Sequence, residues 1–143
     1  MIIASILKQK GAEVTSVRPT DRIAEVVESL STRRIGAVLV LDATGRPLGI
    51  VSERDVVRAL HSHGARALDM TAGQLMTADL STATPQTTVS EAMNLMTEGR
   101  FRHLPVLQEG KLAGLISIGD VVKSRLMEQE QEVDGLKAYV AGG

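Results

Sequence analysis

The chain of 143 residues contains no cysteine and no tryptophan, and its aromatic side chains are limited to Phe101 and Tyr139. The absence of cysteine excludes disulfide bonds, thiolate nucleophiles and cysteine-based zinc sites, and it is typical of a reducing compartment. With so few aromatic rings, the chain lacks the stacking platforms on which many proteins bind single-stranded nucleic acid. Its core must be aliphatic, and a hydrophobic content of 43% is enough to form one.

An excess of basic residues is also missing. The chain has 16 Lys and Arg against 17 Asp and Glu, and its isoelectric point is about 6.3. Proteins that bind duplex DNA normally carry a basic excess that neutralises phosphates, so we expect no nucleic-acid partner. Residues 1–8 lack the features of a signal peptide, and no apolar stretch approaches the roughly 20 residues that span a bilayer. We therefore expect a cytoplasmic protein without a membrane span.

The sequence repeats itself once. Identical residues recur 66 residues apart in the first part of each half and 65 residues apart in the second part. A single gap near Thr44 brings both halves into register, so chance is a poor explanation. The matched pairs include Pro19 and Pro85, Glu25 and Glu91, Arg34 and Arg100, Gly49 and Gly114, Ser52 and Ser117, and Asp55 and Asp120.

Each half predicts the order β-α-β-β-α, which places the chain in the α+β class. Apolar residues at helical spacing follow a short extended segment, and two apolar runs separated by a turn precede a closing helix. The predicted strands cover 14–17, 37–41 and 48–51, and then 80–83, 104–107 and 113–116. A unit of about 60 residues buries too little surface to be stable alone, so we expect the two units to pack together.

These patterns predict a first repeat over 1–63, a linker over 64–74, a second repeat over 75–127 and a C-terminal amphipathic helix and tail over 128–143. Residues 121–139 are predicted to form one long amphipathic helix, which either lies on its own module or contacts a second copy or another partner. Its apolar residues approximate a heptad seam, with Gln129 in one polar seam position. The apolar seam residues are Val122, Leu126, Val133, Leu136 and Val140.

The most specific motifs are two segments in register, Gly49–Asp55 with the sequence GIVSERD and Gly114–Asp120 with the sequence GLISIGD. Together with Leu75-Met76-Thr77 and Arg102-His103-Leu104-Pro105-Val106, they resemble the tandem CBS domain pair, or Bateman module, in a stand-alone protein of bacterial type. The resemblance covers residues 6–127. It implies two CBS repeats packed about a pseudo-two-fold axis, followed by a C-terminal helix.

The resemblance implies that clefts between the repeats bind adenosine-containing ligands such as AMP, ADP, ATP, NAD or S-adenosylmethionine. These ligands are regulatory and not catalytic. Such modules usually form homodimers, and because no effector domain is recognisable here, the output would act in trans on an unidentified partner protein. We expect no enzyme activity, because the sequence has no Walker glycine loop, metal-ligand cluster or nucleophile elbow. A ligand-free dimerisation or interaction scaffold is the alternative.

The two Ser-x-x-Asp motifs supply the central ligand-binding candidates. Asp55 and Asp120 are expected to accept hydrogen bonds from two vicinal ribose hydroxyls, because a carboxylate has two oxygens for two donors. Ser52 and Ser117, at the starts of helices, would suit a phosphate. A capping box explains the same motif without a ligand, and the two roles can coexist.

The family resemblance adds further candidates. Ser16 and Thr82, each three residues before a proline, match nucleotide contacts, although a hydroxyl bonded at its own strand end explains them equally well. Basic residues at the positions of Arg102 and His103 contact phosphate in related proteins, and here they would serve the nucleotide held by Asp55; a solvated loop pair is the alternative. Adenine would lie against apolar strand residues, for which the candidates are Ala37, Val38, Ile50, Val51, Leu115 and Ile116.

The first half departs from the phosphate-binding pattern. Gly36 and Ala37 stand at the positions that match Arg102 and His103, and neither carries a charge. The sequence therefore predicts that the site built around Asp55 binds phosphorylated ligands more tightly than the site around Asp120.

Overall fold

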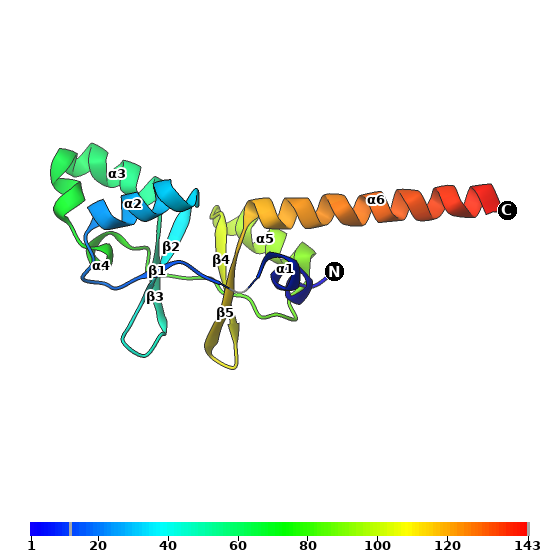
Figure 1. Cartoon of the computed structure of the whole chain (residues 1–143), viewed down its shortest axis with the longest axis horizontal. Coiled ribbons are helices and arrows are strands. Elements are labelled where there is room, and N and C mark those ends of the chain that lie inside the picture. The colour runs from blue at the N-terminus through cyan, green and yellow to red at the C-terminus, as the bar shows by residue number, and fades with distance from the viewer. Residues whose placement is uncertain (12, 143) are drawn as a thin grey trace. The chain divides into compact units, whose positions relative to one another are not determined.

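The computed structural model describes residues 1–11 and 13–142, and its mixture of helices and two small sheets confirms the α+β class (Figure 1). The predicted β-α-β-β-α order is present in the first half, the α-β-β-α part of it recurs in the second, and the closing helix of the second half continues without a break into the C-terminal tail. The elements are α1 (Ile3–Lys10), β1 (Ser16–Val17), α2 (Ile23–Arg33), β2 (Ala37–Leu41), β3 (Pro47–Ser52), α3 (Glu53–His63), a 3-10 helix η1 (Gly64–Asp69), α4 (Ala72–Leu75), α5 (Val89–Gly99), β4 (His103–Gln108), β5 (Lys111–Ser117) and α6 (Ile118–Gly142).

The two sheets differ by one strand. In the first sheet, β1 pairs parallel with β2, and β2 pairs antiparallel with β3; the second sheet contains only β4 and β5. The strand predicted over 80–83 is reduced to a single parallel bridge between Ala83 and Val106. A proline explains the difference: Leu39 donates its N–H to the Thr15 carbonyl, whereas the matching residue in β4 is Pro105, which has no N–H to donate.

The repeat extends to backbone conformation. The helices α2 and α5 both end at an arginine in the left-handed conformation, with φ of 53° at Arg34 and 56° at Arg100. In both cases the next residue donates its N–H to the carbonyl five residues earlier in the helix, which satisfies a terminal acceptor. The two halves therefore share local geometry as well as residue pattern.

The chain forms two compact units, and each has its own core. The N-repeat unit comprises Glu13–Leu80 and Glu109–Leu112, and the C-repeat unit comprises Met1–Ala12, Ser81–Gln108 and Ala113–Gly143. The core of the N-repeat unit lies between its sheet and its helices, and it contains Ile23, Val26, Leu30, Val38, Val40, Val51, Val56 and Ala72.

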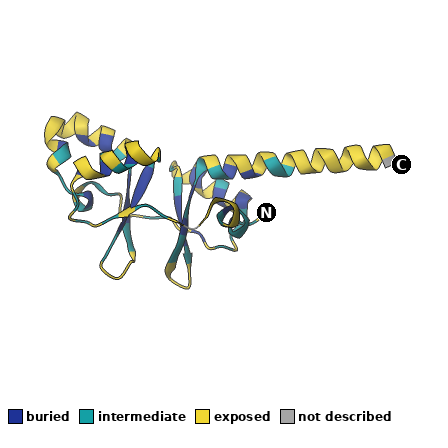
Figure 2. Cartoon of the chain, in the orientation of Figure 1, coloured by how far each residue is buried: buried dark blue, intermediate teal, exposed yellow. Residues whose placement is uncertain are grey.

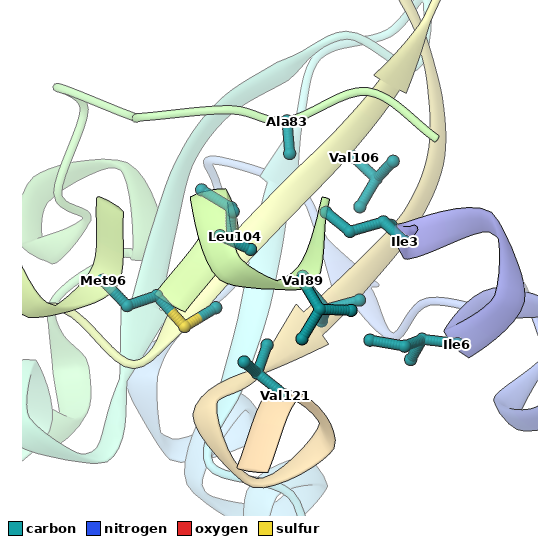
Figure 3. Packing of buried hydrophobic residues seen from close by; sticks show 10 residues of the cluster. Ile3, Ile6, Ala83, Val89, Met96, Leu104, Val106 and Val121 are labelled. Carbon is teal, nitrogen blue, oxygen red and sulfur yellow. The ribbon is translucent and has the colours of Figure 1, made fainter. Parts of the chain in front are cut away.

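The N-terminal helix α1 belongs to the C-repeat unit, so residues 1–63 do not form one compact body. Ile3 is fully buried and Ile6 nearly so, and both pack among side chains of α5, β4 and α6 (Figure 3). Hydrogen bonds fix the start of the helix, since the N–H groups of Ile3 and Ala4 donate to the carbonyls of Thr87 and Pro85.

The segment between the repeats is largely helical. It contains η1 and α4, and α4 begins with a capping box in which Thr71 and Gln74 exchange side-chain and backbone hydrogen bonds. Two carbonyls of the N-repeat unit, those of Pro19 and Asp21, accept N–H groups from the start of α4. The segment predicted as a linker is therefore packed into the N-repeat unit.

Candidate functional site

In the N-repeat unit, Ser52 and Asp55 close the junction between β3 and α3. One oxygen of Asp55, Oδ2, accepts the Ser52 N–H at 2.8 Å and its hydroxyl at 3.0 Å, while the Asp55 N–H donates to the Ser52 hydroxyl at 3.3 Å. The predicted capping box is thus confirmed. The carboxylate is only partly buried, and it lies in the first turn, where the helix dipole favours negative charge.

The segment Met76-Thr77 covers this junction. Thr77 and Ile50 exchange backbone hydrogen bonds of 2.8 and 3.0 Å, and the Thr77 hydroxyl donates to Oδ1 of Asp55 at 3.2 Å. Such a close approach requires glycine at position 49, because a Cβ there would lie 2.7 Å from the Met76 sulfur and 2.8 Å from the Thr77 carbonyl oxygen. The glycine of the GIVSERD motif therefore makes room for the covering segment.

The C-repeat unit builds the same junction between β5 and α6. Asp120 accepts the Ser117 N–H at 2.8 Å, and its own N–H donates to the Ser117 hydroxyl at 3.2 Å. Here the covering segment is α1, because a Cβ on Gly114 would lie 2.6 Å from a methyl carbon of Leu7. Each signature glycine therefore contacts the segment that leads into the other repeat. Gly49 contacts Met76-Thr77, which precedes the Ala83 bridge, and Gly114 contacts α1, which precedes β1.

The two junctions differ in the group that reaches the carboxylate. The Lys10 ammonium lies 2.6 Å from Oδ2 of Asp120, and it also donates to the Leu115 carbonyl at 2.9 Å. Burial by itself would raise the pKa of Asp120, but hydrogen bonds from Lys10 and Ser117 and the Lys10 charge outweigh burial and hold the pKa below its ordinary value of 3.8. Asp120 is therefore held as a carboxylate by an internal cation, whereas Asp55 meets a neutral hydroxyl.

The apolar candidates fall on two faces of their sheets. Val38, Val51 and Ile116 are fully buried members of the two hydrophobic cores. Successive residues of a strand point to opposite faces, so the neighbouring candidates Ala37, Ile50 and Leu115 lie on the sheet faces opposite those cores. The second set lies outside those two clusters, but Ala37 and Ile50 are themselves only 3% and 9% exposed, and Leu115 is partly buried.

The remaining candidates lie near strand ends. Ser16 is exposed in β1 and Thr82 is exposed just before the Ala83 bridge. Arg102 is exposed and His103, the first residue of β4, is partly buried; the Arg102 carbonyl accepts the N–H of Ile118, which follows the Ser117 cap. Arg102 is thereby fixed beside the first turn of α6 in the C-repeat unit.

A shallow depression of about 570 Å³ lies in the N-repeat unit, away from the Ser52–Asp55 junction. Of the predicted site residues it includes Ser16 only, beside Arg18, Asp21 and Asp42. Hydrogen bonds within its own turn, first from the Thr44 hydroxyl and then from the Arg46 N–H, lower the pKa of Asp42. These bonds explain Asp42 as a turn residue, so we assign the depression no role.

Two residues that contact the signature carboxylates were missed by sequence reasoning, Lys10 and Thr77. Lys10 is 110 residues from Asp120, and Thr77 is 22 residues from Asp55. Thr77 ends the Leu75-Met76-Thr77 motif, so that motif was its only signal in the sequence. Lys10 lies in a helix that the sequence did not predict, and it carried no signal of its own.

Two kinds of feature are absent from the described residues. Between residues 1–11 and 13–142, no helix combines the length and the apolar character needed to cross a membrane. Within the same part of the chain, no group of three or more His, Cys, Asp or Glu side chains is arranged to hold a metal ion.

Two repeats that share the order α-β-β-α, each with a Ser-x-x-Asp cap behind a glycine-bearing strand, define a tandem-repeat class of α+β protein. A family model described as CBS domain matches residues 9–62 and again residues 72–126. The chain belongs to the CBS domain family and contains two copies of the domain, which confirms the predicted tandem pair.

Relatives and solved structures agree with this assignment. A mitochondrial CBS domain-containing protein of Arabidopsis thaliana is 34% identical over 149 aligned residues, which cover 99% of this chain and 72% of the relative. The crystal structure of a CBS-domain containing protein from Agrobacterium tumefaciens is 43% identical, with a TM-score of 0.85 over 87% of this chain and 99% of that one. A CBS domain protein from Pyrobaculum aerophilum, solved in complex with AMP, is 28% identical, with a TM-score of 0.75 over 84% of this chain and 89% of that one.

Proposed function

We propose that this chain is a regulatory module that binds an adenosine-containing nucleotide and passes the signal in trans to a partner protein. One observation carries the proposal: both units present a partly buried carboxylate, Asp55 or Asp120, in the first turn of a helix that follows a glycine-bearing strand. The AMP in the related protein from Pyrobaculum aerophilum supports a ligand of this chemical class. AMP, ADP, ATP and NAD share the adenosine portion to which these groups are suited.

Each group in the proposed site has a defined role. The carboxylates of Asp55 and Asp120 accept hydrogen bonds from the ribose hydroxyls, and the helix N-termini at Ser52 and Ser117 favour a phosphate. Arg102 adds a guanidinium that can bind phosphate through two N–H groups. The other proposed contacts are the His103 ring, the hydroxyls of Ser16 and Thr82, and the adenine-lining side chains Ala37, Ile50 and Leu115.

The proposal assigns no catalytic step to this chain. Its output is conformational, because a ligand changes a protein's state only by binding one arrangement better than another. We propose that the output acts on a separate effector protein, that the chain works as a homodimer, and that it does so in the cytoplasm.

A ligand-free interaction scaffold is the second candidate function, and a specific observation favours it. Both signature carboxylates already have partners inside their own units, since Asp55 contacts Ser52 and Thr77 while Asp120 contacts Ser117 and Lys10. A capping role alone satisfies these groups, so a test must separate capping from binding.

Isothermal titration of AMP into protein stripped of bound nucleotide makes this separation. Asp55→Asn and Asp120→Asn keep a side-chain oxygen but remove the charge, and we expect each to weaken AMP binding at its own site. Asp134→Asn, an exposed position in α6, is the matched control and leaves binding unchanged. Tight AMP binding that neither site variant alters would refute the assigned residues, and no AMP binding by the unchanged chain would favour the scaffold.

The phosphate role of Arg102 has its own comparison. Arg102→Ala is expected to weaken the binding of AMP while leaving adenosine unaffected, because adenosine has no phosphate for the guanidinium to bind. An equal loss for both ligands would show that Arg102 acts on the shape of the site and not on the phosphate.

A further inference from the structure

The C-terminal part of α6 extends beyond the packed part of the C-repeat unit. Val121 and Ser124 are buried in the C-repeat unit, but every residue from Gln129 to Ala141 is exposed (Figure 2). An isolated helix of this length is marginal in water, and Gly135 in its middle lowers helix stability further relative to alanine. A stable helix here requires a partner surface.

The exposed part also carries an apolar stripe. Along α6, Val122, Leu126, Gln129, Val133, Leu136 and Val140 are spaced alternately by four and three residues, which is the a and d pattern of a coiled coil. Six of the ten exposed large hydrophobic side chains in the described chain belong to this one helix, and Leu136 and Val140 are 65% and 74% exposed. Such a concentration of exposed apolar groups marks an interaction surface.

The seam residues favour two strands. With Leu126, Val133 and Val140 at a positions, the d positions fall on Val122, Gln129 and Leu136. β-Branched residues at a together with leucine at d favour a parallel dimer, and Val133, Leu136 and Val140 follow this pattern, whereas Val122 and Leu126 reverse it. The polar Gln129 at d lowers the stability of any seam pairing that buries it. The pattern thus suits a second helix of the same sequence.

When the whole seam overlaps, the charges beside it favour the parallel orientation. The g positions are occupied by Arg125, Glu132 and the uncharged Tyr139, and the e positions by Lys123, Glu130 and Lys137. In a parallel, in-register pair, each g residue faces the e residue five positions later on the other helix. Arg125 then faces Glu130 and Glu132 faces Lys137, so both contacts join opposite charges.

An antiparallel pair that overlaps along the whole seam lacks this complementarity. If Val133 is placed opposite Gln129 of an antiparallel copy, Glu130 meets Glu130 and Lys123 meets Lys137. Like charges at these positions oppose pairing. Arg125 is nearly half exposed and forms an ion pair of 3.1 Å with Glu128 in its own helix. On pairing, it has to leave Glu128 and bind Glu130 of the second helix.

We propose that α6 pairs with α6 of a second copy of this chain as a parallel, in-register, two-stranded coiled coil. The partner is identified by the self-complementary charges on the two sides of one apolar seam. The inference does not depend on which ligand the two units bind. It assigns the dimer contact to a surface outside the repeats, and it brings the C-terminal ends of two chains together.

Disulfide cross-linking tests this pairing directly, because the chain has no cysteine of its own. Gln129→Cys places a thiol in the seam at a d position, where a parallel in-register pair brings two identical positions within disulfide reach. Gln131→Cys is a matched control, since it replaces the same residue type at an exposed f position on the outer side of the helix. We expect mild oxidation to link the Gln129→Cys chains into covalent dimers and to leave the Gln131→Cys chains monomeric.

The other outcomes overturn the proposal. Equal linking at both positions would indicate random collision. No linking at either position would show that α6 does not pair with α6 of a second copy and would point to a different partner. Linking that occurs only when Gln129→Cys and Val133→Cys chains are mixed would indicate the antiparallel arrangement. As a second test, Glu132→Lys should slow cross-linking of the Gln129→Cys chain by placing like charges opposite Lys137, and adding Lys137→Glu should restore it. The absence of that rescue would also refute the assigned pairing.

Discussion

Replacing Lys10 by methionine removes the ammonium group that Asp120 binds while keeping an unbranched side chain of similar length. The ammonium lies 2.6 Å from the carboxylate, with side-chain exposures of 38% for Lys10 and 23% for Asp120. Pairs this accessible to water contribute little, generally between 0 and about 1 kcal/mol. The second hydrogen bond, to the Leu115 carbonyl, places this pair near the upper end, so we expect Lys10→Met to lower the free energy of unfolding by about 0.5 to 1 kcal/mol.

The pH dependence of this effect follows from the lowered pKa of Asp120. A carboxyl group whose pKa is lower in the folded state stabilises the fold above its ordinary value, here 3.8, and this contribution is lost as the pH falls through the lowered pKa. The stability difference between the unchanged chain and Lys10→Met should therefore be full at neutral pH and should shrink well below pH 3.8. Urea unfolding at neutral pH and at a pH well below 3.8 measures this stability difference.

The same substitution tests access to the Asp120 site. If ribose hydroxyls must displace the Lys10 ammonium, removing that competitor strengthens binding at this site by at most about fivefold, which corresponds to 1 kcal/mol. Titration of AMP into Lys10→Met and Lys10→Met/Asp120→Asn chains measures the gain. Weaker binding by Lys10→Met would refute the competition and would show that Lys10 is itself a ligand contact. An unchanged stability at neutral pH would refute the assigned ion pair.

Two further predictions concern the segments that cover the junctions. Gly49→Ala should destabilise the chain by about 1 to 3 kcal/mol in urea unfolding, because its Cβ meets the Thr77 backbone at 2.8 Å. Gly114→Ala should cost less, since the end of the flexible Leu7 side chain can move, and equal costs would contradict this explanation. Ile3→Ala should destabilise the C-repeat unit by about 2 to 5 kcal/mol, because Ile3 is fully buried there, while exposed Lys8→Ala should change stability by less than about 0.5 kcal/mol. Hydrogen exchange at β4 and β5 locates the Ile3 effect, and a loss of protection confined to the N-repeat unit would contradict the placement of α1.

Local signals in the sequence predicted most of the repeated architecture. The helical spacing of apolar residues predicted α2 and α5, and the apolar runs predicted β2 to β5. These patterns are visible because each element buries one face against others within its own repeat of about 60 residues. The Ser-x-x-Asp pattern predicted the caps at Ser52 and Ser117, since a capping box is formed by residues three positions apart. These are interactions that a local pattern records.

Contacts over long sequence separations were not predictable in the same way. The eight residues of α1 are too few for a clear helical period, and the core that they join is formed by residues beyond position 80. The pairing of Lys10 with Asp120 depends on that docking, so no local pattern could reveal it. The loss of a regular strand at 80–83 could have been predicted from the sequence, because Pro105 lacks the N–H donor that Leu39 supplies in the first repeat.

The alternation of side chains along a strand divides the predicted adenine-lining residues between two faces of the sheet. Val38 and Val51 alternate with Ala37 and Ile50 along β2 and β3, so the period of two separates core residues from those on the opposite face. Which face belongs to the core depends on where α2 and α3 pack. That choice is a property of the tertiary structure and not of either strand.

The central claim is that this chain binds an adenosine-containing nucleotide, and a thermal-shift panel on nucleotide-stripped protein tests it most directly. The panel comprises AMP, ADP, ATP, NAD and S-adenosylmethionine, with the Asp55→Asn/Asp120→Asn chain as control. A ligand at a hundredfold excess over its Kd stabilises the folded state by about 2.7 kcal/mol, which raises the Tm of a chain this size by several degrees. We predict such a rise with at least one of these ligands and none in the double variant; no rise with any of them would contradict the account.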